Sequence, residues 1–65
     1  MNTRRDLKPN EVEIVWIGTR GNDGAVEYIQ ADKVAFNGLA LVCDLRGHQI
    51  VIPLTSIRRF RVKAQ

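Results

Sequence analysis

The chain has 65 residues, ten of them Lys or Arg and seven Asp or Glu, so its net charge at neutral pH is +3. This length allows one small domain, and a core of that size often needs a disulfide, a metal ion or a second subunit for support. Cys43 is the only cysteine, which excludes an internal disulfide, and Cys43 and His48 are too few soft ligands for structural zinc. We therefore expect no metal and no cofactor, and oligomerisation remains as the available support.

The composition is that of an ordinary soluble globular protein, with 45% hydrophobic and 26% charged residues. No apolar run approaches the ~20 residues of a membrane span. Residues 1–6 are not followed by a hydrophobic stretch, so we expect no signal peptide and no membrane partner. Together with the single cysteine, these features predict a cytoplasmic location.

Basic charge is concentrated at the two ends of the chain. Residues 1–8 and 58–63 hold seven cations against one carboxylate, a net charge of +6. Residues 9–57 hold three cations against six carboxylates, a net charge of −3. This asymmetry suggests an anionic partner or a basic tail.

The first half of the chain predicts an arm and two strands. Residues 1–10 are polar and end in Pro9-Asn10, so we predict a flexible basic arm over 1–10 and one domain over 11–65. β-Branched and aromatic residues then predict a strand over 11–17. A glycine-rich turn at 19–24 follows, and a second strand is predicted over 25–31.

The second half of the chain contains a hairpin signal and three further predicted strands. Asn37-Gly38 between apolar runs indicates a two-residue type I′ turn, which would set Phe36 opposite Leu39 and Val34 opposite Leu41. Residues 39–43 are apolar on both faces and predict a central strand. Gly47 is the expected left-handed residue of the next turn. A strand is predicted over 49–52. Pro53 has no amide hydrogen for a ladder, so the strand ends, bulges or runs along a sheet edge there, and residues 57–63 alternate again.

Five or six short strands joined by tight turns predict an all-β antiparallel meander. Closure into a small SH3-like or Sm-like barrel would remove exposed strand edges. The alternative is an open curled sheet completed by dimerisation. In either case we expect a buried core made by six large side chains: Ile14, Trp16, Phe36, Leu41, Ile50 and Ile52.

One short segment resembles a known family. Residues 45–50, Leu-Arg-Gly-His-Gln-Ile, are similar to the second signature of Sm-like RNA-binding proteins, an aliphatic residue followed by Arg-Gly, two variable residues and an aliphatic residue. The resemblance covers about a tenth of the chain and implies a small RNA-binding barrel. The first signature of the family is not present: Asp32 and Asn37 are five positions apart, where the family pattern has four.

The last strand is the candidate binding site. Its alternation places Arg59, Arg61 and Lys63 on one face at intervals of about 6.7 Å, similar to the phosphate spacing of an extended nucleic acid strand. Alternation puts Arg58 on the opposite face, with Phe60 and Val62, but we include Arg58 among the anion-binding residues, and we expect Arg4 and Arg5 on the arm to extend the surface. The sequence thus predicts a non-enzymatic nucleic-acid-binding module. The structural alternative is a charged edge that blocks aggregation.

No catalytic residues are predicted, because His48 falls in a turn and Cys43 in an apolar strand, where a thiol behaves as a small hydrophobe. A second hypothesis is a protein-interaction adaptor or inhibitor that docks a larger protein through its sheet edge or apolar surface. The two apolar strands that contain Ala40, Val42 and Val51 have apolar side chains on both faces, and one small core can bury only one of these faces. We expect them to form the contact of a homodimer or a higher homo-oligomer.

Overall fold

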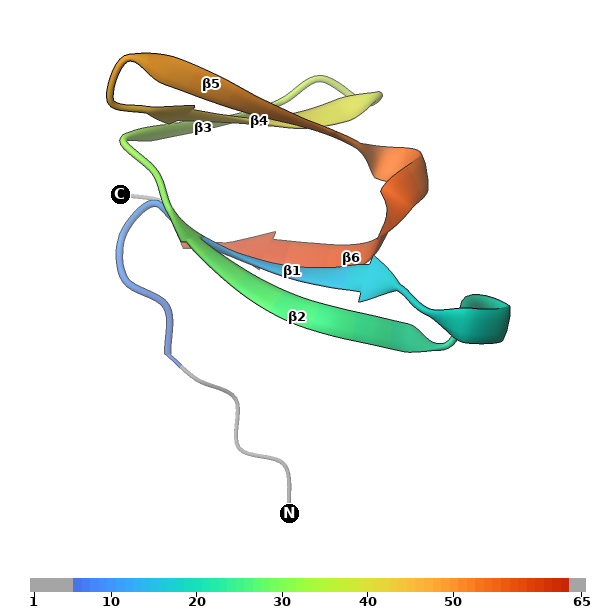
Figure 1. The fold of residues 1–65 in the computed structure, drawn as a ribbon. Coiled ribbons are helices and arrows are strands. Elements are labelled where there is room, and N and C mark those ends of the chain that lie inside the picture. The colour runs from blue at the N-terminus through green and yellow to red at the C-terminus, as the bar shows by residue number, and fades with distance from the viewer. Residues whose placement is uncertain (1–5, 64–65) are drawn as a thin grey trace.

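The computed structural model describes residues 6–63 and consists of two opposed three-stranded antiparallel sheets. The strands are β1 (Glu11–Ile17), β2 (Asp23–Gln30), β3 (Lys33–Phe36), β4 (Ala40–Leu45), β5 (His48–Pro53) and β6 (Ile57–Val62). Two single 3₁₀ turns are η1 (Thr19–Gly21) and η2 (Leu54–Ser56). The sheets have the orders β2-β1-β6 and β3-β4-β5 and lie as two layers (Figure 1). The predicted all-β antiparallel fold is confirmed.

The chain passes between the layers at two places. Residues 31 and 32 join β2 directly to β3, and η2 carries the chain from β5 back to β6 (Figure 1). Strand β6 then pairs with β1, so the first and last strands are neighbours. Within residues 6–63 no strand ladder joins one sheet to the other. The structure therefore has two opposed sheets, and the expected closure into one barrel is not seen. In this part of the chain no helix is long and apolar enough to cross a membrane.

The core lies between the two sheets. Its fully buried side chains come from the central strands, Val12 and Ile14 from β1 and Leu41 and Cys43 from β4. Central strands lose most surface because they have neighbours on both sides and the opposite sheet above them. The predicted burial of Ile14, Leu41 and Ile52 is confirmed.

Three predicted core residues are less buried than expected. Trp16 and Ile50 are half-buried and pack against the edge of the core. The prediction for Phe36 is wrong, because its side chain is 58% exposed. Phe36 is the last residue of the short edge strand β3, so the opposite sheet covers only part of its ring, which contacts Phe60 at a centroid distance of 5.7 Å.

The β3–β4 hairpin has a different register from the predicted one. Phe36 pairs with Leu41 and Val34 with Cys43, a shift of two residues. Of the turn residues only Gly38 has positive φ, at +87°, whereas the predicted type I′ turn needs positive φ at both central residues. The Asn37 side chain accepts hydrogen bonds from the backbone amides of Leu39 and Ala40 and so stabilises this turn. Because the shift is even, each side chain keeps its predicted face.

Strand β6 contains a β-bulge that sequence alternation missed. Val15 pairs with Arg59 and the next residue, Trp16, pairs with Ile57, so Arg58 is an extra residue. The bulge lets both Ile57 and Phe60 pack toward the core although they are three positions apart. Strict alternation had placed Ile57 on the same face as Arg59.

Residues 6–10, assigned by the sequence to a flexible arm, are held against the first sheet. Leu7 is buried, and the Asn10 amide donates to the Lys63 carbonyl oxygen at 2.9 Å. The Gln30 side chain donates to the Pro9 carbonyl oxygen at 2.9 Å. Arg4 and Arg5 lie outside the described residues, so an arm remains a prediction there.

Candidate nucleic-acid interface

The outer face of sheet β2-β1-β6 carries the predicted binding residues. Strand pairing places Tyr28, Glu13 and Arg61 in one row across the sheet. The adjacent row consists of Val26, Val15 and Arg59. The alternate residues of β1 point the other way, into the core. We call this outer surface, with the bulged Arg58 and Lys63 at the end of the strand, the charged face.

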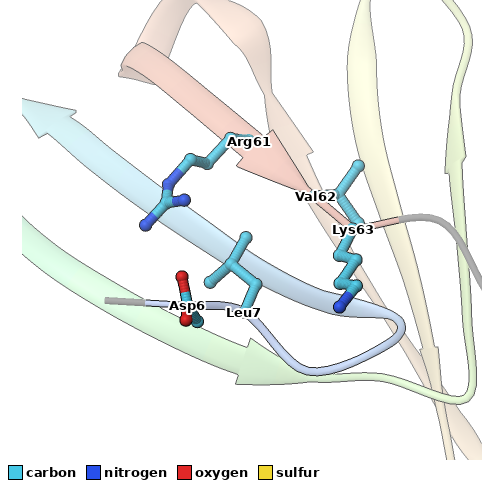
Figure 2. Close-up of a pocket in the computed structure, with 5 residues that line it drawn as sticks. All are labelled: Asp6, Leu7, Arg61, Val62 and Lys63. Carbon is cyan, nitrogen blue, oxygen red and sulfur yellow. The ribbon is translucent and has the colours of Figure 1, made fainter. Parts of the chain in front are cut away.

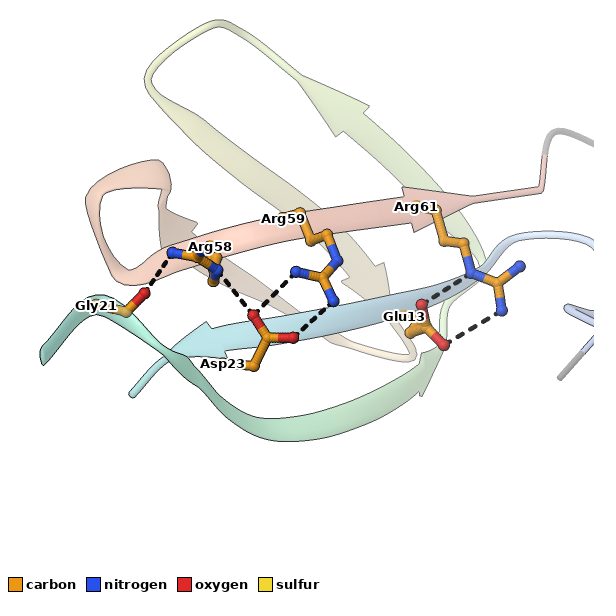
Figure 3. A network of polar contacts seen from close by, with 6 residues as sticks. All are labelled: Glu13, Gly21, Asp23, Arg58, Arg59 and Arg61. Atoms are coloured by element: carbon orange, nitrogen blue, oxygen red, sulfur yellow. Dashed lines mark hydrogen bonds and ion pairs between the residues drawn. The ribbon is translucent and has the colours of Figure 1, made fainter. Parts of the chain in front are cut away.

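Arg61 and Glu13 form a bidentate ion pair in the centre of the charged face. The Arg61 Nε atom donates to Glu13 Oε1 at 2.8 Å, and a terminal nitrogen of its guanidinium donates to Glu13 Oε2 at 3.2 Å (Figure 3). The Tyr28 hydroxyl donates to the same Oε2 atom at 2.8 Å. The hydrogen bond to Glu13 raises the pKa of Arg61, so its guanidinium stays charged.

Asp23, at the start of β2, holds two guanidiniums at once. Arg59 donates to both carboxylate oxygens, at 3.0 and 2.7 Å, and the Arg58 Nε atom lies 2.7 Å from Oδ1 (Figure 3). The bulge brings the two consecutive arginines to one carboxylate. The Arg59 hydrogen bond is the largest of the influences that lower the pKa of Asp23, and Arg58 adds to it. Arg58 also donates to the Gly21 carbonyl oxygen, which ties η1 to β6.

A hollow of about 380 Å³ lies at the end of β6, between this strand and the segment that leads into β1. It is lined by Asp6, Leu7, Arg61, Val62 and Lys63. Figure 2 shows the side chains of Arg61 and Lys63 reaching from β6 toward the segment that carries Leu7. Within residues 6–63, Lys63 has no ion-pair partner. The hollow is therefore open to solvent and has the cations Arg61 and Lys63 on one side.

The structure brings together four of the six predicted anion-binding residues, Arg58, Arg59 and Arg61 on β6 and Lys63 directly after it. Sequence reasoning missed that Asp23 and Glu13 hold three of them. The pairing of β1 with β6, 48 positions apart at Glu13 and Arg61, has no local signal. Sequence reasoning also gave Tyr28 no role in the site, although the alternation of residues 25–31 placed it on the face opposite to Ile29.

The predicted oligomer contact lies on the outer face of the second sheet. Val42 pairs with Ala35 on one side and Val51 on the other, which makes an apolar row across the sheet. Ala40 and Pro53 pair in the next row. Val51 is 57% exposed, whereas Ala40 and Val42 are half-buried. This surface is the apolar counterpart of the charged face.

The remaining candidate groups do not assemble into a reactive site. Cys43 is buried in the core, and burial raises the pKa of its thiol. His48 is exposed, with Nδ1 3.1 Å from the Arg46 carbonyl oxygen. Across residues 6–63, no three His, Cys, Asp or Glu side chains cluster as metal ligands would. Comparisons with protein-family models, curated proteins and solved structures found no match to this chain.

Proposed function

We propose that the chain is a non-enzymatic nucleic-acid-binding module that holds phosphates along β6. The observation that carries the proposal is the composition of the charged face. Three cations, Arg58, Arg59 and Arg61, lie on β6 and a fourth, Lys63, directly follows it, and two carboxylates, Asp23 and Glu13, hold three of the four. The cations exceed the carboxylates by two, and Arg4 and Arg5 would add to this excess.

The carboxylates orient the guanidiniums as well as offset their charge. A free arginine side chain loses rotamer freedom when it binds a phosphate, which weakens the interaction. Arg59 is already fixed by Asp23 and spends two of its five N–H donors there. Within the described residues its other three donors remain for a phosphate, whose oxygens suit the guanidinium fork. Such contacts position a nucleic acid without reading its bases.

The test uses a pair of charge-matched double variants. Arg59→Gln with Lys63→Gln removes two cations from β6 and leaves each carboxylate one arginine partner. Lys33→Gln with Arg46→Gln removes two exposed cations from the second sheet. We expect the β6 variant to weaken binding of a labelled oligonucleotide and to reduce the slope of log K against log salt by about two.

The matched control variant should keep the parent affinity and slope. Fluorescence anisotropy at several salt concentrations measures both quantities, and thermal unfolding checks that each variant is folded. Absence of binding by the parent at about 50 mM salt would contradict the proposal, as would equal slopes for the two variants.

We also propose that the two sheets act as one SH3-like or Sm-like barrel. The direct passage of β2 into β3 and the single turn η2 between β5 and β6 support this, because both connections keep strands of different sheets close. The Arg46-Gly47 turn supports the Sm-like version, since Gly47 has the left-handed φ of +74° expected for it. Amide hydrogen exchange tests closure. In a closed barrel, the amides of β5 and β6 that point away from their own sheets should be protected, because the two edge strands would pair with each other.

A second candidate function is a protein-interaction module. The apolar row of Ala35, Val42 and Val51 on the second sheet favours it, because an exposed apolar surface often marks a contact with another protein. We propose that its first occupant is a second copy of this chain, through Ala40, Val42 and Val51. A cytoplasmic location fits both functions and remains part of the proposal.

A further inference from the structure

We infer that the nucleic acid is single-stranded and that one of its bases stacks on the ring of Tyr28. This inference rests on the proposed function of the charged face. Its starting point is the row Tyr28–Glu13–Arg61, which places an aromatic ring and a phosphate-binding guanidinium on the same face of one sheet.

Tyr28 is presented as a platform. Its side chain stands on the edge strand β2, and the residue is 41% exposed. The hydroxyl donates to Glu13 Oε2 at 2.8 Å, which fixes the far end of the ring while its exposed surface faces solvent. Val26, two residues earlier on the same face, is 50% exposed and extends the apolar surface. An aromatic ring held in this way loses little freedom when a base stacks on it.

The hydrogen bonds to Glu13 bring the phosphate-binding end of Arg61 close to the Tyr28 ring. The Arg61 guanidinium reaches Glu13 on β1, and one of its terminal nitrogens and the Tyr28 hydroxyl both donate to Glu13 Oε2, at 3.2 and 2.8 Å. A phosphate on this guanidinium would therefore leave its own base beside the Tyr28 ring. Arg61 offsets the charge of Glu13 along this path.

Base accessibility decides between single and double strands. In a duplex the bases are stacked on each other and only their edges are exposed, so a ring on a sheet cannot cover a base face. Single-stranded nucleic acid offers its base faces, and binders of single strands combine a basic groove with aromatic rings. Phe36 is also exposed but belongs to the second sheet and contacts Phe60, so it provides an aromatic control away from the charged face.

Three substitutions and one spectroscopic signal test the inference. Tyr28→Leu should weaken binding of labelled oligothymidylate by roughly 5- to 150-fold, the range that base–aromatic stacking produces. Tyr28→Phe keeps the ring and loses only the bond to Glu13 that orients it, so it should bind clearly more tightly than Tyr28→Leu. Phe36→Leu should also leave affinity unchanged. Anisotropy titrations at one low salt concentration give these values.

Tyr28 is the only tyrosine in the chain, so its ring protons can be assigned without ambiguity. Oligothymidylate should shift these resonances upfield in the parent protein, a measurement that does not depend on any variant folding. A duplex of the same length should bind more weakly and leave them unshifted.

The outcomes separate this inference from the proposed function. If the parent binds both oligothymidylate and duplex, with no ring shift and no effect of Tyr28→Leu, phosphate binding stands and stacking is overturned. If Tyr28→Phe is as weak as Tyr28→Leu, the hydroxyl rather than the ring matters and stacking is again overturned. If the parent binds neither nucleic acid, both proposals are wrong.

Discussion

Asp23 is the residue on which the geometry of the charged face depends most. It is exposed, yet it receives hydrogen bonds or close ion-pair contacts from Arg58 and Arg59, and Arg58 also reaches Gly21. The single carboxylate thus joins the bulge of β6 to the turn between β1 and β2. It aligns two guanidiniums that would repel each other without it.

The charge state of Asp23 should affect stability in acid. Because Arg59 and Arg58 lower its pKa in the folded state, the ionised form stabilises the fold. This stabilisation is complete above the ordinary aspartate pKa of 3.8 and is lost as the pH falls through the lower folded value. Asp23→Asn should therefore lower the melting temperature at pH 7, and the difference from the parent should shrink below about pH 4.

Thermal unfolding of both proteins between pH 7 and pH 2 measures this effect. Asp32→Asn is the control, because Asp32 is exposed and has no ion pair within residues 6–63. A constant difference between Asp23→Asn and the parent across the whole range would show that the ion pairs of Asp23 do not stabilise the fold.

At the scale of the elements, strand existence followed from the sequence and strand register did not. Alternation in residues 11–17 and the apolar run before Cys43 predicted β1 and the central position of β4. The turn at Gly38 and the bulge at Arg58 changed which residues pair. At the turn the Asn37 side chain bonds to amides two and three residues later, a local contact that the pattern of apolar residues does not show. At the bulge Arg59 contacts Asp23, 36 positions away, which happens only in the folded chain.

The two leucines of the β3–β4 hairpin give a direct test of the observed register. Leu41 is fully buried, whereas Leu39 is 82% exposed at the turn. Leu41→Ala should destabilise the fold by about 2–5 kcal/mol, because it removes buried surface and leaves a cavity. A domain of this size has a total stability of roughly 3–10 kcal/mol, so this loss is a large fraction of it.

Leu39→Ala makes the same chemical change at the exposed site and should alter stability by less than about 0.5 kcal/mol. Urea unfolding followed by Trp16 fluorescence measures both variants. Equal losses of stability would mean that the turn lies where the sequence first placed it.

At the scale of the molecule, the two outer faces differ in kind. One carries paired charges around Glu13 and Asp23, and the other carries the apolar row centred on Val42. The presence of cations on the last strand was predictable because it needed only alternation. The matching carboxylates were not, since the pairing of β1 with β6 joins opposite ends of the chain.

The apolar face should hold two copies of the chain together. We expect the parent to sediment as a dimer or larger at high micromolar concentration. Val51→Lys should shift it to the 7.4 kDa monomer by placing a charge in the contact. Val26→Lys introduces the same change at a similarly exposed position on the other sheet and should leave the assembly intact. A monomeric parent would contradict this expectation.

The pairing of β1 with β6 also determines when the charged face is completed during synthesis. The second sheet is built from neighbouring hairpins, whose strands meet soon after they are made. The first sheet needs β6, which is made after its other two strands, to close a loop spanning most of residues 6–63, and such long-range closure is slow. Until then β1 has an open edge and Asp23 and Glu13 have no arginine partners. A chain interrupted before residue 57 would therefore lack both the completed first sheet and the four cations at positions 58–63.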